Sequence, residues 1–117
     1  MDVSARGGVT VVTVSGSLDS QTHSLFVTAL QSIIARHYDL VVVDMLNVDF
    51  IGTQCIESLL DFGSLASSHD VGWVLCSLRA VARPLQMLGI ADEIPMADSL
   101  DEAIGLVGRR TTLIDIA

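Results

Sequence analysis

The sequence predicts a single α/β domain with a mixed, mostly parallel central sheet of four to five strands, about four helices and an antiparallel pair of strands at the N-terminus. The length, 117 residues, is typical of one domain. Short apolar runs rich in β-branched residues alternate with stretches of helical periodicity. Strands that alternate with helices need crossover connections, so most neighbouring strands must run parallel.

The expected strands are short and mostly apolar. A two-glycine turn at Gly7-Gly8 separates the first two, which predicts a hairpin. The last contains a proline, which is tolerated at the edge of a sheet. In chain order, the expected strands cover Val3–Ala5, Gly8–Gly16, Leu40–Asp44, Gly72–Cys76 and Glu93–Met96.

Four stretches predict helices. The first is capped by Asp19 or Ser20 and runs to about His37, with apolar residues at helical spacing. The last begins at Ser99 with Glu102 three residues later, a capping-box pattern, and extends to about Val107. Pro84 must lie in the first turn of the third helix or kink it. The four helices are expected near residues 20–37, 53–69, 79–88 and 99–107, which makes 1–108 the domain and 109–117 a C-terminal tail.

Composition argues against several functions. The net charge is −8, and the six basic residues are all arginine, a balance that disfavours nucleic acid and anionic membranes as partners. No apolar stretch approaches the ~18–20 residues of a membrane-spanning helix, and no signal sequence is apparent, so we expect a cytoplasmic protein without membrane insertion. The apolar fraction of 50% favours self-association, with monomer and homodimer both left open.

The residue patterns of common active sites are missing from the sequence. The three histidines and two cysteines are scattered without ligand spacing, which predicts no metal and no cofactor. No nucleophile stands with a histidine and a carboxylate at recognisable positions, and no glycine-rich phosphate loop is present. We therefore expect a protein that binds a partner and is not an enzyme.

The most informative segment is the corner that follows the Leu40–Asp44 strand, where the chain breaks at Gly52 and a helix starts at Thr53. A threonine at a helix start is usually a helix cap. The same place suits a phosphate, because free N–H groups and the positive end of the helix dipole point there. Thr53 is thus either scaffolding or a switch.

Four segments together resemble the STAS-domain family, the fold of bacterial anti-sigma-factor antagonists, over nearly the whole chain. Ser15–Asp19 is similar to the family's Gly-Glu-Leu-Asp turn, and Gly52–Ile56 stands where the family has Asp-Ser-Ser-Gly-Leu. Residues 42–51, and 72–76 followed by 81–90, resemble the family's strands, short helix and Gly-Leu segment. The order and spacing of these segments carry the resemblance, which implies a STAS-type fold.

The resemblance implies a function. Antagonists of this family bind an anti-sigma factor, often a serine kinase with a histidine-kinase-like fold, and so release a sigma factor. In the family, phosphorylation of the residue that follows the motif's aspartate releases the partner. By position, the resemblance implies that this acceptor is Thr53. Gly52, Gln54 and Cys55 replace the motif's aspartate, second serine and glycine. The implied partner-binding residues are Asp19, Ser20, Ile51, Gly52, Gln54, Cys55 and Ile56.

Other roles remain open at this stage. STAS domains also serve as accessory subunits of membrane-transporter ATPases and as ligand-sensing modules. Asp19 is expected to cap a helix, to contact the partner, or both. A thiol at a helix N-terminus, as at Cys55, often has a lowered pKa and invites a redox role, whereas Cys76 is expected to be buried and inert.

Overall fold

The computed structural model describes the backbone of residues 1–116 and the side chains of residues 1–108. Over this part of the chain five strands form the main sheet, in the order β1-β2-β4-β6-β7, and two form a small separate sheet, β3-β5. The strands are β1 (Asp2–Arg6), β2 (Val9–Thr13), β3 (Gly16–Leu18), β4 (Leu40–Asp44), β5 (Val48–Ile51), β6 (Gly72–Cys76) and β7 (Met96–Ala97). The helices are α1 (His23–Ala35), α2 (Thr53–Ser68), α3 (Arg79–Met87), the 3-10 turn η1 (Ala91–Glu93) and α4 (Leu100–Ile116).

This architecture confirms the predicted fold class. β1 pairs antiparallel with β2, and all other pairs of the main sheet are parallel. Gly7 and Gly8 form the two-residue turn between β1 and β2, with φ of 56° and 83°. Positive φ at both positions is what a type I′ hairpin turn requires, and glycine adopts it without strain.

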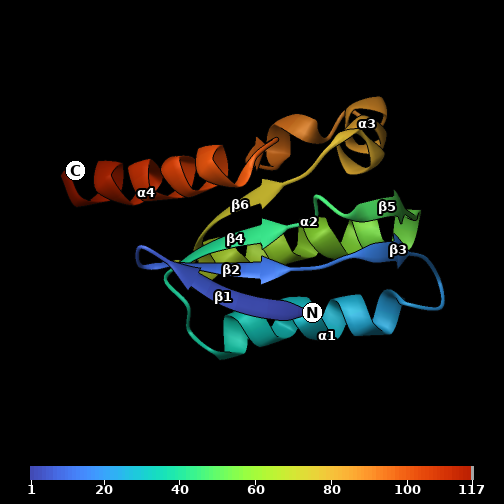
Figure 1. Ribbon diagram of the computed structural model, residues 1–117, viewed down its shortest axis with the longest axis horizontal. Helices are drawn as coiled ribbons and strands as arrows, with labels where there is room; N and C mark the ends of the chain where they lie inside the picture. The colour runs from blue at the N-terminus through green and yellow to red at the C-terminus, as the bar shows by residue number, and fades with distance from the viewer. Residues whose placement is uncertain (117) are drawn as a thin grey trace.

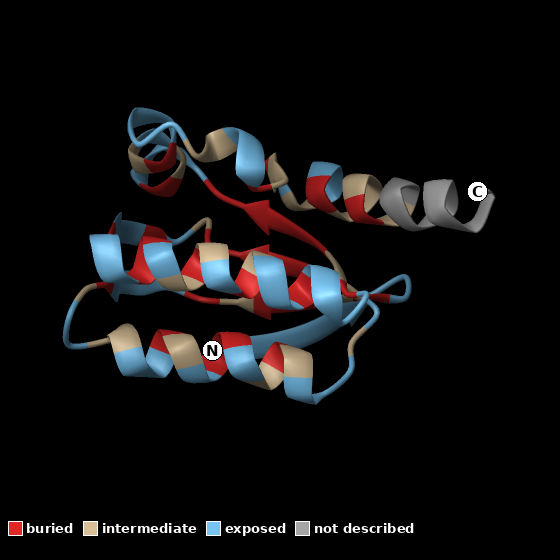
Figure 2. Ribbon diagram, turned by 180° about the vertical axis from the view of Figure 1, so that it is seen from behind, coloured by how far each residue is buried: buried red, intermediate tan, exposed pale blue. Residues whose placement is uncertain are grey.

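The sheet lies between two layers of helices (Figure 1). One face of the sheet packs on α1 and α2 around a large apolar cluster that includes Val12, Val43, Leu59 and Leu75. The opposite face carries a smaller cluster under α4, with Val42 and Val74 at its centre. Figure 2, seen from behind, shows the buried residues on the inner surfaces of these layers. Because β4 and β6 are covered on both sides, their sequences are continuously apolar rather than alternating.

Several predicted element bounds are wrong. α1 starts at His23, after a turn over residues 19–22, and α4 continues to Ile116, well past Val107. Ala117, the end of the predicted tail, lies outside the described residues. Pro84 is the sixth residue of α3, beyond its first turn. In place of a Glu93–Met96 strand the chain forms η1 and then the two-residue strand β7.

The small sheet was not predicted at all. β3 and β5 run parallel, with Leu18 opposite Ile51. β5 also contacts α3, whose buried residues Val81 and Leu85 join the large cluster. The carboxyl ends of β3 and β5 therefore lie next to each other, and α1 and α2 both follow from them. None of the helices described is long and apolar enough to cross a bilayer.

Candidate functional site

The site is the junction of two connections, one from β3 into α1 and one from β5 into α2. The Gly52 N–H donates to the Leu18 carbonyl at 2.8 Å. The Cys55 thiol lies 4.0 Å from the Asp19 carbonyl oxygen, at the limit of a sulfur hydrogen bond. These two contacts hold the Asp19 turn against the first turn of α2, so residues more than 30 positions apart in sequence share one surface.

Thr53 is exposed at the first position of α2 and is not its cap. Gly52 is the N-cap residue, with φ −86° and ψ 166°, and its carbonyl accepts from the Cys55 and Ile56 N–H groups at 3.1 and 3.0 Å. Within the described chain, the Thr53 hydroxyl and the N–H groups of Thr53 and Gln54 have no hydrogen-bond partner. The N-terminus of α2 therefore presents an exposed hydroxyl beside two N–H groups without a hydrogen-bond partner among the described residues. This arrangement suits an anion.

Asp19 organises the turn that leads into α1. Its carboxylate accepts from the N–H groups of Gln21 and Thr22 at 3.0 and 3.1 Å. The Thr22 hydroxyl accepts in return from the Asp19 N–H at 3.0 Å. This reciprocal pair has the geometry of a capping box, with threonine in the place that Glu or Gln usually takes. Asp19 thus caps this turn and not α1 itself, which begins four residues later at His23 and has Thr22 as its N-cap residue.

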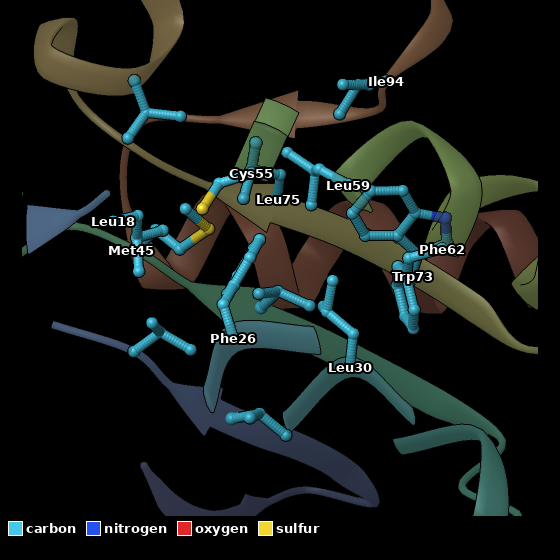
Figure 3. Close-up of a cluster of buried hydrophobic side chains, with 14 of the residues drawn as sticks. Leu18, Phe26, Leu30, Met45, Cys55, Leu59, Phe62, Trp73, Leu75 and Ile94 are labelled. Carbon is cyan, nitrogen blue, oxygen red and sulfur yellow. The ribbon is translucent and has the colours of Figure 1, made fainter. Parts of the chain in front are cut away.

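Three of the predicted partner-binding residues are buried. Ile51 is 5% exposed, Cys55 1% and Ile56 4%, and all three belong to the large core cluster. Figure 3 shows the Cys55 side chain directed into this cluster, with Leu18 and Met45 near it. The helix start turns these three side chains inward, and their part in binding a partner stays a prediction. Ser20, Gln54 and Thr53 are exposed, and Asp19 and Gly52 are partly exposed.

The pKa of the Cys55 thiol is raised, chiefly by burial and further by the negative charge of Asp19. The expected lowering at a helix N-terminus is therefore wrong: loss of solvation for the thiolate outweighs the favourable partial charge of the helix end. The predicted redox role loses its physical basis, since reactivity depends on an accessible thiolate. Cys76 is buried as expected, and the pKa of its thiol is raised to about 11 by burial and by nearby carboxylates, Asp44 first.

Two β5 residues that the sequence did not single out, Asp49 and Phe50, complete the surface. Phe50 is 52% exposed, and its ring edge lies 3.6 Å from the position that a Cβ on Gly52 would take. The Ser17 hydroxyl donates to the Asp49 carboxylate at 2.7 Å and ties β3 to β5. The sequence pattern did not reveal β5 as a strand, because it has only four residues. Two of them, Asp49 and Phe50, are exposed in succession, so exposed and buried residues do not alternate.

His23 links α1 to α2 on the same side of the molecule. Its Nε2 lies 2.8 Å from the Ser58 hydroxyl, and that hydroxyl also donates to the Gln54 carbonyl at 3.1 Å. Ser58 therefore contacts both the His23 ring and the backbone of the first turn of α2. The pair therefore positions the first turn of α2 against the start of α1, a role that sequence alone did not indicate.

Within residues 1–108, no group of three or more histidine, cysteine or acidic side chains is placed to hold a metal ion. A groove of about 210 Å³ lies between α1 and α2, and its lining includes Leu30, Ser58 and Phe62. Its volume is below the ~300–1,000 Å³ of typical small-molecule sites.

The chain belongs to the STAS-domain family, whose model matches residues 1–103. It is similar in structure to an anti-sigma factor antagonist from Mycobacterium paratuberculosis, with a TM-score of 0.81, 25% identity and 90% of each chain covered. A protein from Thermotoga maritima, suggested to be an anti-sigma factor antagonist, shares the fold with a TM-score of 0.80, 17% identity and 91% and 92% of the two chains covered. No sequence relative was found among proteins of curated function.

Proposed function

We propose that this protein is an anti-sigma-factor antagonist that acts in the cytoplasm. It binds a kinase-like anti-sigma factor and thereby frees a sigma factor, and phosphorylation of Thr53 breaks the complex. The observation that carries the proposal is an exposed hydroxyl at the start of α2, beside unpaired N–H groups and next to the Asp19 turn. Family membership and the similarity to the mycobacterial antagonist support it.

The contact surface in this proposal consists of the accessible part of the junction: Asp19, Ser20, Gly52, Thr53, Gln54 and Phe50. Phe50 provides the half-exposed aromatic side chain that commonly anchors a protein interface. The contribution of Ile51, Cys55 and Ile56 is indirect. Their packing in the large core cluster determines where α2 begins. The buried layer therefore shapes the surface that a partner contacts.

A phosphate on Thr53 would leave the fold intact and change the surface. It adds about 1.5–2 negative charges at a helix N-terminus, where the free N–H groups tolerate them. In a complex the partner would have to remove water from this charge, and the charge adds to that of Asp19, whose turn contacts the first turn of α2. The expected result is loss of the complex without loss of stability.

The test is affinity capture from the native host with wild-type protein, Thr53→Glu and Ser64→Glu. Ser64 is exposed on the same helix, eleven residues on and therefore about three turns along nearly the same face, so it adds an equal charge outside the proposed contact. We expect wild type and Ser64→Glu to retain a protein with a kinase-like ATP-binding fold and Thr53→Glu to lose it. Intact mass of the protein from its host shows whether it carries a phosphate.

Two outcomes would contradict the proposal. Retention of a transporter ATPase in place of a kinase-like protein would favour the accessory-subunit role. Equal retention by all three proteins would leave binding in place and remove Thr53 as the switch. Phe50→Ala removes the exposed aromatic side chain and should also weaken capture. Leu25→Ala, which removes an exposed apolar side chain of α1 instead, is its control.

A further inference from the structure

β1 is an unprotected edge of the main sheet. It pairs with β2 on one side and with no other described strand, and all five of its residues are exposed (Figure 1). Natural sheets usually guard such edges with charged side chains, above all lysine, or with proline, a bulge or a covering helix, and β1 carries charge only at its two ends, Asp2 and Arg6. β1 contains neither lysine nor proline, and its register with β2 is regular from Asp2 to Arg6.

The hairpin turn determines which backbone groups of β1 are free. Arg6 and Val9 flank the two-residue turn, and residues that flank such a turn exchange both of their hydrogen bonds. Hydrogen-bonded and non-hydrogen-bonded pairs then alternate along the strand, so Asp2, Ser4 and Arg6 direct their N–H and C=O groups to β2. Val3 and Ala5 direct theirs away from the sheet, which leaves four backbone groups for another strand.

The side chains of β1 are complementary to themselves. An antiparallel second copy centred on Ser4 places Val3 opposite Ala5, so that the outward backbone groups meet in four hydrogen bonds. The same register places Asp2 opposite Arg6 twice, in non-hydrogen-bonded pairs, where facing side chains lie closest. Within the described chain, neither Asp2 nor Arg6 has an ion-pair partner. A shift by two residues removes both charge pairs, so the charges select one register.

We propose that two copies of this chain associate through β1. The two β1 strands pair antiparallel, so that the two main sheets form one continuous sheet. Four backbone hydrogen bonds and two Asp2–Arg6 pairs form the contact. The contact is small, so the dimer belongs to the weak class of interfaces, below about 1,200 Å². It also weakens as salt is added, because exposed charge pairs are screened. This self-association does not depend on the partner proposed above, and β1 lies outside that contact surface.

Sedimentation equilibrium at high protein concentration tests the proposal on the full chain. Wild type should shift towards twice its mass of 12.4 kDa. Asp2→Arg and Arg6→Asp each place two like-charged pairs across the junction. Each should weaken self-association by about tenfold, because two attractive pairs become two repulsive ones.

The charge pattern also predicts rescue. An equimolar mixture of Asp2→Arg and Arg6→Asp brings arginines opposite aspartates and should associate, and the double variant with both changes should dimerise with itself. Thermal unfolding by circular dichroism confirms that each variant is folded, which is expected because both side chains are exposed. A monomeric wild type, unchanged dimers in both single variants, or a mixture that does not associate would each overturn the proposal.

Discussion

Removing the Asp19 carboxylate should destabilise the fold and not only affect binding. The carboxylate accepts two backbone N–H groups, from Gln21 and Thr22 at 3.0 and 3.1 Å, and the Thr22 hydroxyl also lies 3.3 Å from it. In Asp19→Ala the two N–H groups lose their side-chain acceptor. The turn that sets the path from β3 into α1 then keeps the backbone bond from the Thr22 N–H to the Asp19 carbonyl, at 3.2 Å, and the bonds of the Thr22 hydroxyl to the Asp19 N–H and the Ser17 carbonyl, at 3.0 and 2.8 Å.

The magnitude follows from helix capping. Loss of an Asp cap costs about 0.5–2 kcal/mol and typically about 1. The turn is partly solvated, so water replaces some of the lost bonds and about 1 kcal/mol is the expected decrease in the free energy of unfolding. For a chain of this length that corresponds to a melting temperature lower by roughly 4 °C. Asp19→Asn keeps an acceptor oxygen in place and should lose only a few tenths of a kcal/mol.

Urea unfolding followed by tryptophan fluorescence measures this difference. Trp73 is the single tryptophan, is 5% exposed and packs edge-to-face on Phe62 with ring centroids 4.9 Å apart, so its emission reports loss of the core. Asp39→Ala is the control, because it removes an exposed carboxylate that makes no hydrogen bond in the described chain. An unfolding midpoint of Asp19→Ala equal to that of wild type would refute the capping role.

Two further variants test the N-cap of α2 at Gly52 and the buried thiol of Cys76. Gly52→Asp should raise the free energy of unfolding by up to about 1 kcal/mol, because an aspartate caps better than glycine and restricts the unfolded chain. The site has ordinary φ, and a Cβ would meet the Leu18 carbonyl oxygen no closer than 3.5 Å, so a lower urea midpoint would contradict this estimate. The pKa of the Cys76 thiol rises from 9.0 to about 11 on folding, so the unfolded chain loses that proton first and stability falls as pH rises through this window. Cys76→Ala should therefore show a shallower decline of the melting temperature between these pH values, and parallel declines would show that another group is responsible.

Local sequence pattern was sufficient for the elements of the main sheet. β2, β4 and β6 are short runs of β-branched and apolar residues, and a stretch of helical spacing lies between each of them and the next strand of the main sheet. The Gly7-Gly8 pair predicted the hairpin because only glycine adopts both of the turn's positive φ values easily. The start of α2 at Thr53 was also predicted, from the break at Gly52.

Contacts between distant segments decided what the pattern missed. β3 and β5 have three and four residues, and each forms only because the other lies beside it. No local periodicity reveals a pair that is separated by the whole of α1 and β4. The same pairing brings the Asp19 turn over Cys55, and that burial reverses the pKa shift expected from the position of the cysteine in the helix.

By itself, the sequence determined the order of strands and helices, the antiparallel start of the sheet and the hydroxyl at the beginning of α2, because propensity, turn chemistry and apolar spacing act over a few residues. Only the tertiary structure decided which of the residues around that hydroxyl face solvent and which lie in the core, and it showed that β1 has a free edge. Exposure depends on what packs above each residue, and here the covering segments come from more than 30 positions away.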